Sequence, residues 1–248
     1  MPLSVTIIAR DEADRIPEAI RSVGFADEIL VLDSGSTDDT VVVARALGAR
    51  VEVTDWPGHV AQKNRAVEWA SHDWVLSIDA DERVSPALGA SIRAALEAGP
   101  GCAGFRFARL STYLGKELRH GAWYPDARVR LFDRRCARWG GDDPHDRVEV
   151  DGAVRWLDGD LLHVPYRSLG EHLRTIDRYT AISAAGLRAR GVRARWWDLT
   201  LRPLLHFVKS YLLRAGFRDG VRGLLVAALG ALYVLLKWSR VRLGPEGP

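Results

Sequence analysis

Cysteine is scarce in this chain, which holds only Cys102 and Cys136 among its 248 residues. The two lie far apart, lack the close spacing of metal-binding cysteines, and follow no secretory signal. A disulfide framework is therefore not expected. The default setting for such a chain is the reducing cytoplasm.

Two other features are missing. A strand-like run from Leu3 to Ala9 begins almost at once, so no room is left for the charged, apolar and cleavage regions of a leader. The most apolar stretch, Gly223 to Leu236, is shorter than the roughly 20 residues of a bilayer span and is bounded by Arg222 and Lys237. We therefore expect no export and no membrane crossing, and expect this stretch to lie in the membrane interface.

Charge is unevenly distributed. Residues 1–166 carry 20 Lys and Arg against 27 Asp and Glu, whereas residues 167–248 carry 15 against 5. A basic tail favours an anionic partner, either phospholipid head groups or nucleic acid. Because this tail interleaves arginine with apolar stretches and lacks a nucleic-acid module, an anionic membrane surface is the simpler partner.

The first hundred residues alternate short apolar runs with amphipathic segments. Near-continuous apolar strands separated by helices are typical of a parallel sheet covered on both faces. The predicted fold class is therefore α/β, with a Rossmann-like, mostly parallel sheet. Strands are expected over residues 3–9, 28–34, 50–55 and 73–81, and helices over 15–23, 40–48 and 61–70.

The pattern changes after residue 100. From Cys102 to Leu162 the chain is β-rich and punctuated by turns, which favours an antiparallel extension of the sheet. Beyond Tyr166 it reads as helices. We expect one domain over residues 1–166 and a helical, membrane-associating extension over residues 167–248.

Open α/β sheets bind ligands beyond the carboxyl ends of their strands. Asp79 and Asp81 follow the fourth predicted strand, separated by Ala80. Two carboxylates so placed suit Mg²⁺ or Mn²⁺, with diphosphate oxygens as further ligands. The alternative is a solvated acidic turn that caps a helix at Ser85.

Asp33 ends the second predicted strand and precedes the turn Gly-Ser-Thr-Asp-Asp-Thr. Its carboxylate is placed where a nucleobase or a ribose hydroxyl could be held. The alternative is that Asp33 forms the turn and that Ser36 or Thr37 caps the next helix.

Four segments occur in one order along the chain: IIARDEADRI, VLDSGSTDDT, QKNRA and LSIDADERV. Together they resemble glycosyltransferase family 2, most closely its lipopolysaccharide-core β-glucosyltransferase branch. The resemblance runs from about Leu3 to Val84 and continues more thinly through RLFDR, DPHDRV, LLHVPY and the tail. It implies a GT-A fold and inverting transfer of a hexose from a UDP-sugar to a membrane-linked glycan or glycolipid, such as lipopolysaccharide core, at the cytoplasmic membrane surface.

The resemblance also implies roles for single residues. The metal would be held by Asp79 and Asp81 of the D-x-D motif and completed by His163, although a histidine at a strand end is often structural. The nucleotide sugar would be bound by Ala9, Arg10, Glu12, Asp33, Lys63, Asp79 and Ala80.

Inverting transfer needs a base for the acceptor hydroxyl, and Asp146 in DDPHDRV is the predicted base. The related branch has His-Glu at this point, so Asp142 or Asp143 is an alternative, as is a solvated turn. Arg128 and Arg130 alternate with apolar residues and could face a phosphate-bearing acceptor or acidic neighbours. An alternative function is an inactive nucleotide-binding scaffold at the membrane.

Overall fold

The computed structural model describes residues 1–142 and 145–244, and the chain forms two compact units. The first unit comprises Met1–Arg109 and Asp126–His163. The second comprises Leu110–Pro125 and Val164–Pro248.

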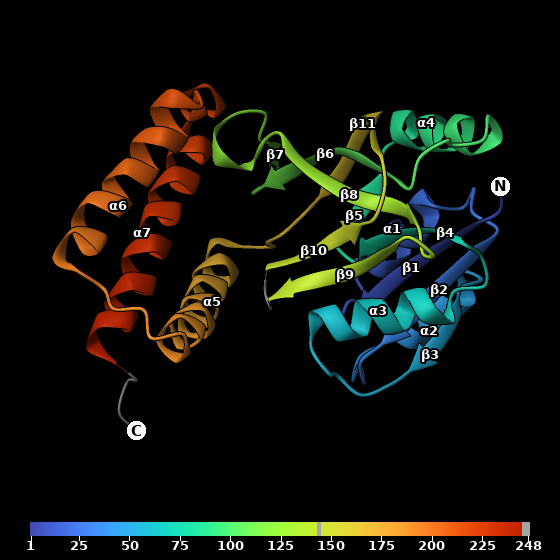
Figure 1. Cartoon of the computed structure of the whole chain (residues 1–248), viewed down its shortest axis with the longest axis horizontal. Helices are drawn as coiled ribbons and strands as arrows, with labels where there is room; N and C mark the ends of the chain where they lie inside the picture. The colour runs from blue at the N-terminus through green and yellow to red at the C-terminus, as the bar shows by residue number, and fades with distance from the viewer. Residues whose placement is uncertain (143–144, 245–248) are drawn as a thin grey trace. The chain divides into compact units, whose positions relative to one another are not determined.

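Four parallel strands begin the sheet of the first unit (Figure 1). They are β1 (Leu3–Ala9), β2 (Glu28–Asp33), β3 (Arg50–Val53) and β4 (Trp74–Asp79), in the order β3-β2-β1-β4. The strand order reverses between β1 and β4, which is the point where open α/β sheets bind ligands. In the register, Ala9 pairs with Asp33 and Ile8 with Asp79, so the polar strand ends meet at one edge.

The helices between these strands lie on both faces of the sheet. Helices α1 (Ile16–Ser22) and α2 (Thr40–Ala46) pack against each other, and α3 (His59–Trp69) packs on β1, β2 and β4. Right-handed crossovers place α3 opposite α1 and α2, because the chain reverses direction across the sheet after β3. The predicted doubly wound arrangement is confirmed.

An antiparallel half continues the sheet, as predicted. After β4 come β8 (Asp126–Asp133), β6 (Gly104–Tyr113), β11 (Val154–His163) and β5 (Glu82–Val84). The pairs β4/β8, β6/β8 and β5/β11 are antiparallel. A separate hairpin is formed by β9 (Ala137–Asp142) and β10 (His145–Val150). The fold is therefore the mixed α/β sheet of the GT-A type.

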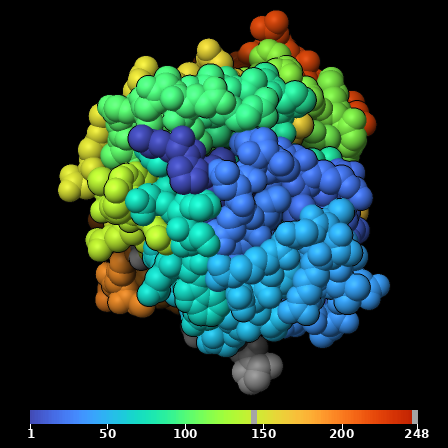
Figure 2. All heavy atoms as spheres, turned by 90° about the vertical axis from the view of Figure 1, so that its right-hand side faces the viewer, coloured from blue at the N-terminus to red at the C-terminus, as the bar shows by residue number. Residues whose placement is uncertain are grey.

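Helix α4 (Pro86–Glu97) covers β11 at very close range. Ser85 is its N-cap and accepts a hydrogen bond from the backbone N–H of Leu88. Gly159 of β11 has φ +104°, and a Cβ there would lie 2.4 Å from the Leu88 nitrogen, so only glycine fits. Figure 2 shows the first residues of the chain against α4, where the Met1 amino group donates to the Leu96 carbonyl at 3.2 Å.

The core of the first unit lies around β1 and β4. Val5, Ile7, Leu76 and Ile78 are at most 1% exposed. Thr6 on the other face of β1 is also buried. Burial of both faces explains why these strands read as continuous apolar runs.

The second unit is mainly helical, as predicted for the tail. It contains α5 (Leu169–Ala189), α6 (Trp196–Val208), the π-helical turn η2 (Lys209–Leu213), the 3-10 turn η3 (Gly216–Asp219) and α7 (Val221–Leu243). The short pieces β7 (Lys116–Glu117) and η1 (Gly121–Trp123) also belong to it. Helices α6 and α7 lie side by side (Figure 1).

Helix α7 is longer than the predicted apolar run. Its 23 residues include Arg222 and continue past Lys237, so it extends beyond both ends of Gly223 to Leu236. By length and composition it could cross a membrane, the one such helix within residues 1–142 and 145–244. Whether the tail stays at the membrane surface remains a prediction.

An aromatic cluster surrounds His172 in the second unit. The Tyr113 hydroxyl lies 3.0 Å from His172 Nδ1, and the Tyr166 ring stacks on the imidazole with 4.1 Å between centroids. Trp123 packs edge-on against Tyr113. Burial lowers the pKa of His172 to about 4, since a charged imidazole would lose its hydration here.

This pKa predicts how stability depends on pH. The ordinary histidine pKa is 6.5, so between pH 6.5 and about 4 the unfolded chain binds the proton and the folded one does not. The His172 contribution is complete above pH 6.5 and falls by about 3 kcal/mol as pH drops to about 4. Urea unfolding followed by tryptophan fluorescence measures this change. The His172→Gln variant should lose stability less steeply over this window, and an unchanged slope would contradict the assignment.

Candidate active site

Two loops at the carboxyl ends of β1 and β2 are joined by hydrogen bonds. The backbone N–H of Thr37 donates to Asp11 Oδ1 at 2.7 Å, and the N–H of Asp11 donates to Ser36 Oγ at 2.9 Å. The N–H of Glu12 donates to Thr40 Oγ1 at 2.8 Å. Asp11 has φ 54°, an unfavourable conformation that these bonds stabilise. These two loops form the rim of the predicted nucleotide pocket, and the backbone of Glu12 is hydrogen-bonded within that rim.

Asp33 shapes its own turn. The side chain is fully buried, and Oδ2 accepts hydrogen bonds from the N–H groups of Gly35 at 3.0 Å and Ser36 at 2.8 Å. The Ser36 hydroxyl donates to Oδ1. Helix α2 begins at Thr40, so the alternative that Ser36 or Thr37 caps it is wrong. Asp33 therefore fixes the loop that follows β2.

Gln62 ties this rim to α3, a role that sequence reasoning missed. Its buried amide donates to Ser34 Oγ at 3.0 Å and to Thr54 Oγ1 at 2.9 Å. Ala9 is buried at the end of β1, whereas Arg10 beside it is exposed. At this edge, hydrogen bonds hold the loops of Glu12 and Asp33, and Arg10 is an exposed cation beside them.

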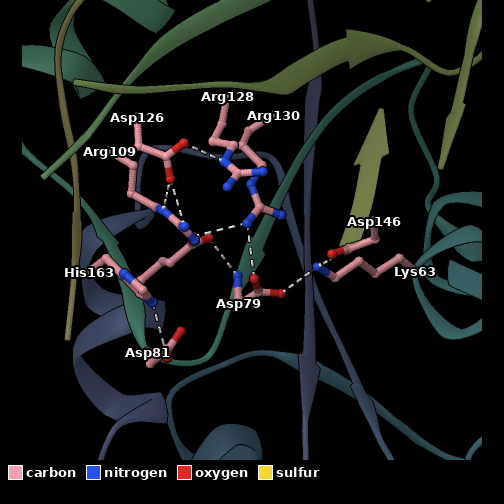
Figure 3. A network of polar contacts seen from close by, with 10 residues as sticks. Lys63, Asp79, Asp81, Arg109, Asp126, Arg128, Arg130, Asp146 and His163 are labelled. Carbon is pink, nitrogen blue, oxygen red and sulfur yellow. Dashed lines mark hydrogen bonds and ion pairs between the residues drawn. The ribbon is translucent and has the colours of Figure 1, made fainter. Parts of the chain in front are cut away.

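Asp79 lies between two buried cations (Figure 3). Lys63 Nζ is 2.9 Å from Oδ1, and Arg130 Nη2 is 3.0 Å from Oδ2. Burial alone would raise the pKa of Asp79, but the charges of Lys63 and Arg130 outweigh it and hold the pKa far below its ordinary value. Asp79 is therefore ionised at any physiological pH, with each oxygen facing a cation.

Glu82 is fully buried beneath this group, and sequence reasoning did not single it out. Its Oε1 accepts from Arg109 at 3.1 Å and Arg130 at 3.0 Å, and its Oε2 accepts from the Asp79 backbone N–H at 3.0 Å. Asp126 pairs with Arg109 at 2.7 Å. Burial would lower the pKa of both arginines, but the charges of their acidic neighbours, Glu82 first among them, outweigh it and raise the pKa of each. Glu82 thus links the buried cations to the backbone of Asp79.

Asp81 and His163 meet at the end of β11. The register of β5 and β11 pairs His163 with Glu82, which brings His163 Nε2 to 3.4 Å from Asp81 Oδ2. Burial would raise the pKa of Asp81, but the charge and hydrogen bond of His163 outweigh it and leave the pKa lowered. The resemblance implies one metal site for both residues, and the structure brings them into contact.

A divalent cation such as Mg²⁺ or Mn²⁺ needs several donor atoms close together. In the described part of the chain, no group of three or more His, Cys, Asp or Glu residues could hold a metal. Asp81 and His163 supply a carboxylate oxygen and a nitrogen in one place, and Mg²⁺ is often bound by one or two carboxylates plus substrate phosphates. Asp81 and His163 therefore fit such an ion, while both oxygens of Asp79 face cations.

Asp146 reaches the same group from the β9/β10 hairpin. Its Oδ2 lies 2.6 Å from Lys63 Nζ, which also lies 4.3 Å from the centroid of the Trp139 ring. Asn64 fixes the hairpin to α3, because it exchanges two hydrogen bonds of 2.9 Å with the Trp139 backbone. Of the alternative bases, Asp143 lies outside the described residues.

For the other alternative base, Asp142, only the backbone is described.

Arg128 and Arg130 both face acidic neighbours, which is the second of the two predicted alternatives. Arg128 Nε lies 2.9 Å from Asp126 Oδ1, and Arg130 lies between Asp79 and Glu82. Arg130 therefore belongs to the buried charge network, whereas the Arg128 side chain is 41% exposed.

The model of glycosyl transferase family 2 matches residues 4–149, more than half of the chain. The chain belongs to glycosyltransferase family 2. This family 2 enzyme is 28% identical over 248 residues to the lipopolysaccharide core biosynthesis glycosyltransferase LpsC of Rhizobium meliloti, covering 97% of this chain and 92% of LpsC. It is 30% identical over 252 residues to an uncharacterized glycosyltransferase of Rickettsia typhi, covering 97% and 86%.

Among solved structures, one similar chain is glucosyl-3-phosphoglycerate synthase of Mycobacterium tuberculosis in complex with Mg²⁺ and UDP. The two are 26% identical, the match covers 54% of this chain and 57% of that one, and the TM-score is 0.40.

The buried network predicts a large cost for changing Glu82. Glu82→Gln leaves Arg109 and Arg130 without their shared negative charge, and breaking a buried ion pair costs about 3–5 kcal/mol. We expect urea unfolding to show this loss. The matched control is Glu52→Gln, which removes a half-exposed pair with Arg50 and should cost less than about 1 kcal/mol. Equal losses would contradict the role of Glu82.

Proposed function

We propose that this family 2 glycosyltransferase moves a hexose from a UDP-linked donor to a membrane-linked glycan or glycolipid such as lipopolysaccharide core, with inversion. One observation carries the proposal: Lys63, Asp79, Asp81, Asp146 and His163 converge at the carboxyl edge of the sheet, although they come from separate parts of the chain. Similarity to LpsC over nearly the whole chain supports a lipopolysaccharide-core acceptor.

The donor would lie across the strand ends. The fixed loops after β1 and β2 offer a rigid edge for the base and ribose, and Asp79 would serve the ribose side of the D-x-D motif. Lys63 carries the buried positive charge best placed for the diphosphate. The proposed donor residues are Ala9, Arg10, Glu12, Asp33, Lys63, Asp79 and Ala80.

Asp81 and His163 would hold Mg²⁺ or Mn²⁺. When bound, the ion neutralises charge on the leaving diphosphate, usually the largest electrostatic contribution in such a site. Asp79 is also a proposed ligand, but it would have to exchange a contact with Lys63 or Arg130 for the ion.

Asp146 is the proposed base. It would take the proton of the acceptor hydroxyl as that oxygen bonds to the anomeric carbon, while the bond to the diphosphate breaks on the opposite side. Lys63 and the hairpin anchored by Asn64 fix the position of the Asp146 carboxylate. Orientation of this kind contributes to rate because the reacting groups need no further ordering.

The enzyme is proposed to act at the cytoplasmic face of a membrane. The tail from residue 167 carries 15 Lys and Arg against 5 Asp and Glu, and α7 is strongly apolar. An anionic membrane surface matches this charge. A membrane-linked acceptor would then lie near the catalytic unit.

Removing the metal site should abolish most transfer. Asp81→Ala deletes one of three proposed ligands and should lower the transfer rate at least about a hundredfold, while chelation by EDTA should stop transfer by the unchanged enzyme. Product formation from radiolabelled donor measures both. The control Asp55→Ala removes an exposed carboxylate and should leave the rate unchanged. Full activity in EDTA rules out the metal.

Removing the base should separate binding from transfer. Asp146→Asn keeps the size of the side chain and should bind donor with near-normal affinity, whereas transfer falls by roughly a hundredfold or more. Calorimetry measures the affinity for the donor, and the assay with radiolabelled donor measures the rate of transfer. If Asp142→Asn or Asp143→Asn shows this behaviour and Asp146→Asn does not, the base lies upstream.

A further inference from the structure

Helix α6 turns an apolar face outward. Trp197, Leu201, Leu204 and Leu205 follow the i, i+4, i+7, i+8 spacing of one helical face, and they are 37%, 50%, 58% and 54% exposed. In a soluble protein this face would normally be buried against the core. Its exposure in α6 indicates a partner that is not part of this unit.

The opposite, polar side of α6 packs on α7. A surface helix usually packs its apolar side on the core and exposes its polar side. His206 lies so close to Gly230 of α7 that a Cβ there would be 2.5 Å from His206 Nε2. The Arg202 guanidinium lies 4.5 Å from the centroid of the Trp238 ring. The polar side of α6 is thus occupied by α7, and the apolar side is left open.

Exposed apolar side chains also follow α6 along the chain. Leu213 of η2 is 77% exposed, Phe217 of η3 is 51% exposed and Val221 at the start of α7 is 72% exposed. By contrast, the large apolar residues exposed within the predicted run Gly223 to Leu236 are Leu224 and Leu235, at 42% and 36%. The main apolar surface of this unit is therefore on α6 and the turns after it.

The charges around this surface have one sign. Lys209, Arg214 and Arg218 are exposed. The acidic residues of the segment are buried: Asp198 is 3% exposed and pairs with Arg202, and Asp219 is 5% exposed and bonds His120 at 2.9 Å. The segment therefore presents exposed cations beside exposed apolar side chains.

We infer that this surface, defined by Trp197, Leu201, Leu204, Leu205, Leu213 and Phe217, is the part of the protein that enters an anionic lipid surface, with α6 lying in the plane of the interface. Amphipathic helices bind membranes through buried apolar area together with attraction to anionic lipids. A second copy of the chain is disfavoured, because it would bring exposed cations against cations.

Tryptophan at this position also fits lipid. Trp196 and Trp197 begin α6, next to exposed Arg195. Tryptophan is enriched at the level of the head groups, where its ring contacts apolar chains and its N–H stays among polar groups. The inference rests on the proposed function only in that a membrane-linked acceptor gives this attachment its purpose.

Flotation of the full chain with vesicles tests the apolar part. The unchanged protein should float with phosphatidylcholine vesicles containing phosphatidylglycerol, and Leu204→Ser with Leu205→Ser should lower the partition coefficient by about tenfold or more. The matched control, Val42→Ser with Val53→Ser, changes two similarly exposed apolar residues of the first unit and should leave flotation unchanged. Leu235→Ser on α7 should lower it less than the α6 double variant does.

A charge variant tests the electrostatic part. Arg214→Gln with Arg218→Gln should lower partition to anionic vesicles roughly thirtyfold, since each basic residue near the surface contributes a factor of about five. Partition to vesicles of phosphatidylcholine alone should change little. The control Arg135→Gln with Arg138→Gln removes two exposed cations of the first unit and should have no effect.

Two results would overturn the inference. One is unchanged flotation of the Leu204 and Leu205 variant. The other is a dimer of the unchanged protein, seen by light scattering without vesicles, that this variant converts to monomer. Release of UDP from the donor in vesicle-free buffer should be equal in variant and unchanged protein. Product formation from radiolabelled donor tests the proposed function separately, so its absence would count against transfer while the flotation result still decides the surface.

Discussion

The buried carboxylate of Glu82 is the constraint on which the candidate site depends. Two arginines that have left water need a negative charge beside them, and Glu82 supplies it to both while also fixing the Asp79 backbone. Arg130 then reaches Asp79, and Asp79 in turn holds Lys63. The positions of Asp79, Lys63 and Asp146 thus follow from neutralising charge inside the sheet.

This arrangement divides the two carboxylates of the D-x-D motif. Asp79 faces cations with both oxygens, whereas Asp81 faces the imidazole of His163. Two identical side chains two residues apart therefore have different chemistry, because one points into the buried network and the other to the end of β11. Lys63 joins the network to Asp146, so the proposed donor and acceptor sides share one cation.

The second unit buries acidic side chains and exposes apolar ones, which is the reverse of the usual distribution in a soluble protein. Its acidic residues Asp198 and Asp219 are buried in pairs, while leucine and tryptophan side chains of α6 remain open to the surroundings. A helix that packs on its neighbour through its polar side is stabilised when its apolar side is buried in a lipid interface. The exposed apolar side of α6, more than the length of α7, is therefore the feature that suits this unit to a membrane-linked substrate.

The sequence by itself determined the four parallel strands, the three helices between them and the place of the D-x-D motif, since side-chain periodicity and strand ends are local properties of the chain. It also indicated the family through four short segments. Tertiary structure alone decided that Lys63 meets Asp146, 83 residues away, and that both oxygens of Asp79 face cations. It also decided that α6 exposes its apolar face. Periodicity predicts that a helix has two faces, but which of them is covered depends on what the rest of the chain packs against it.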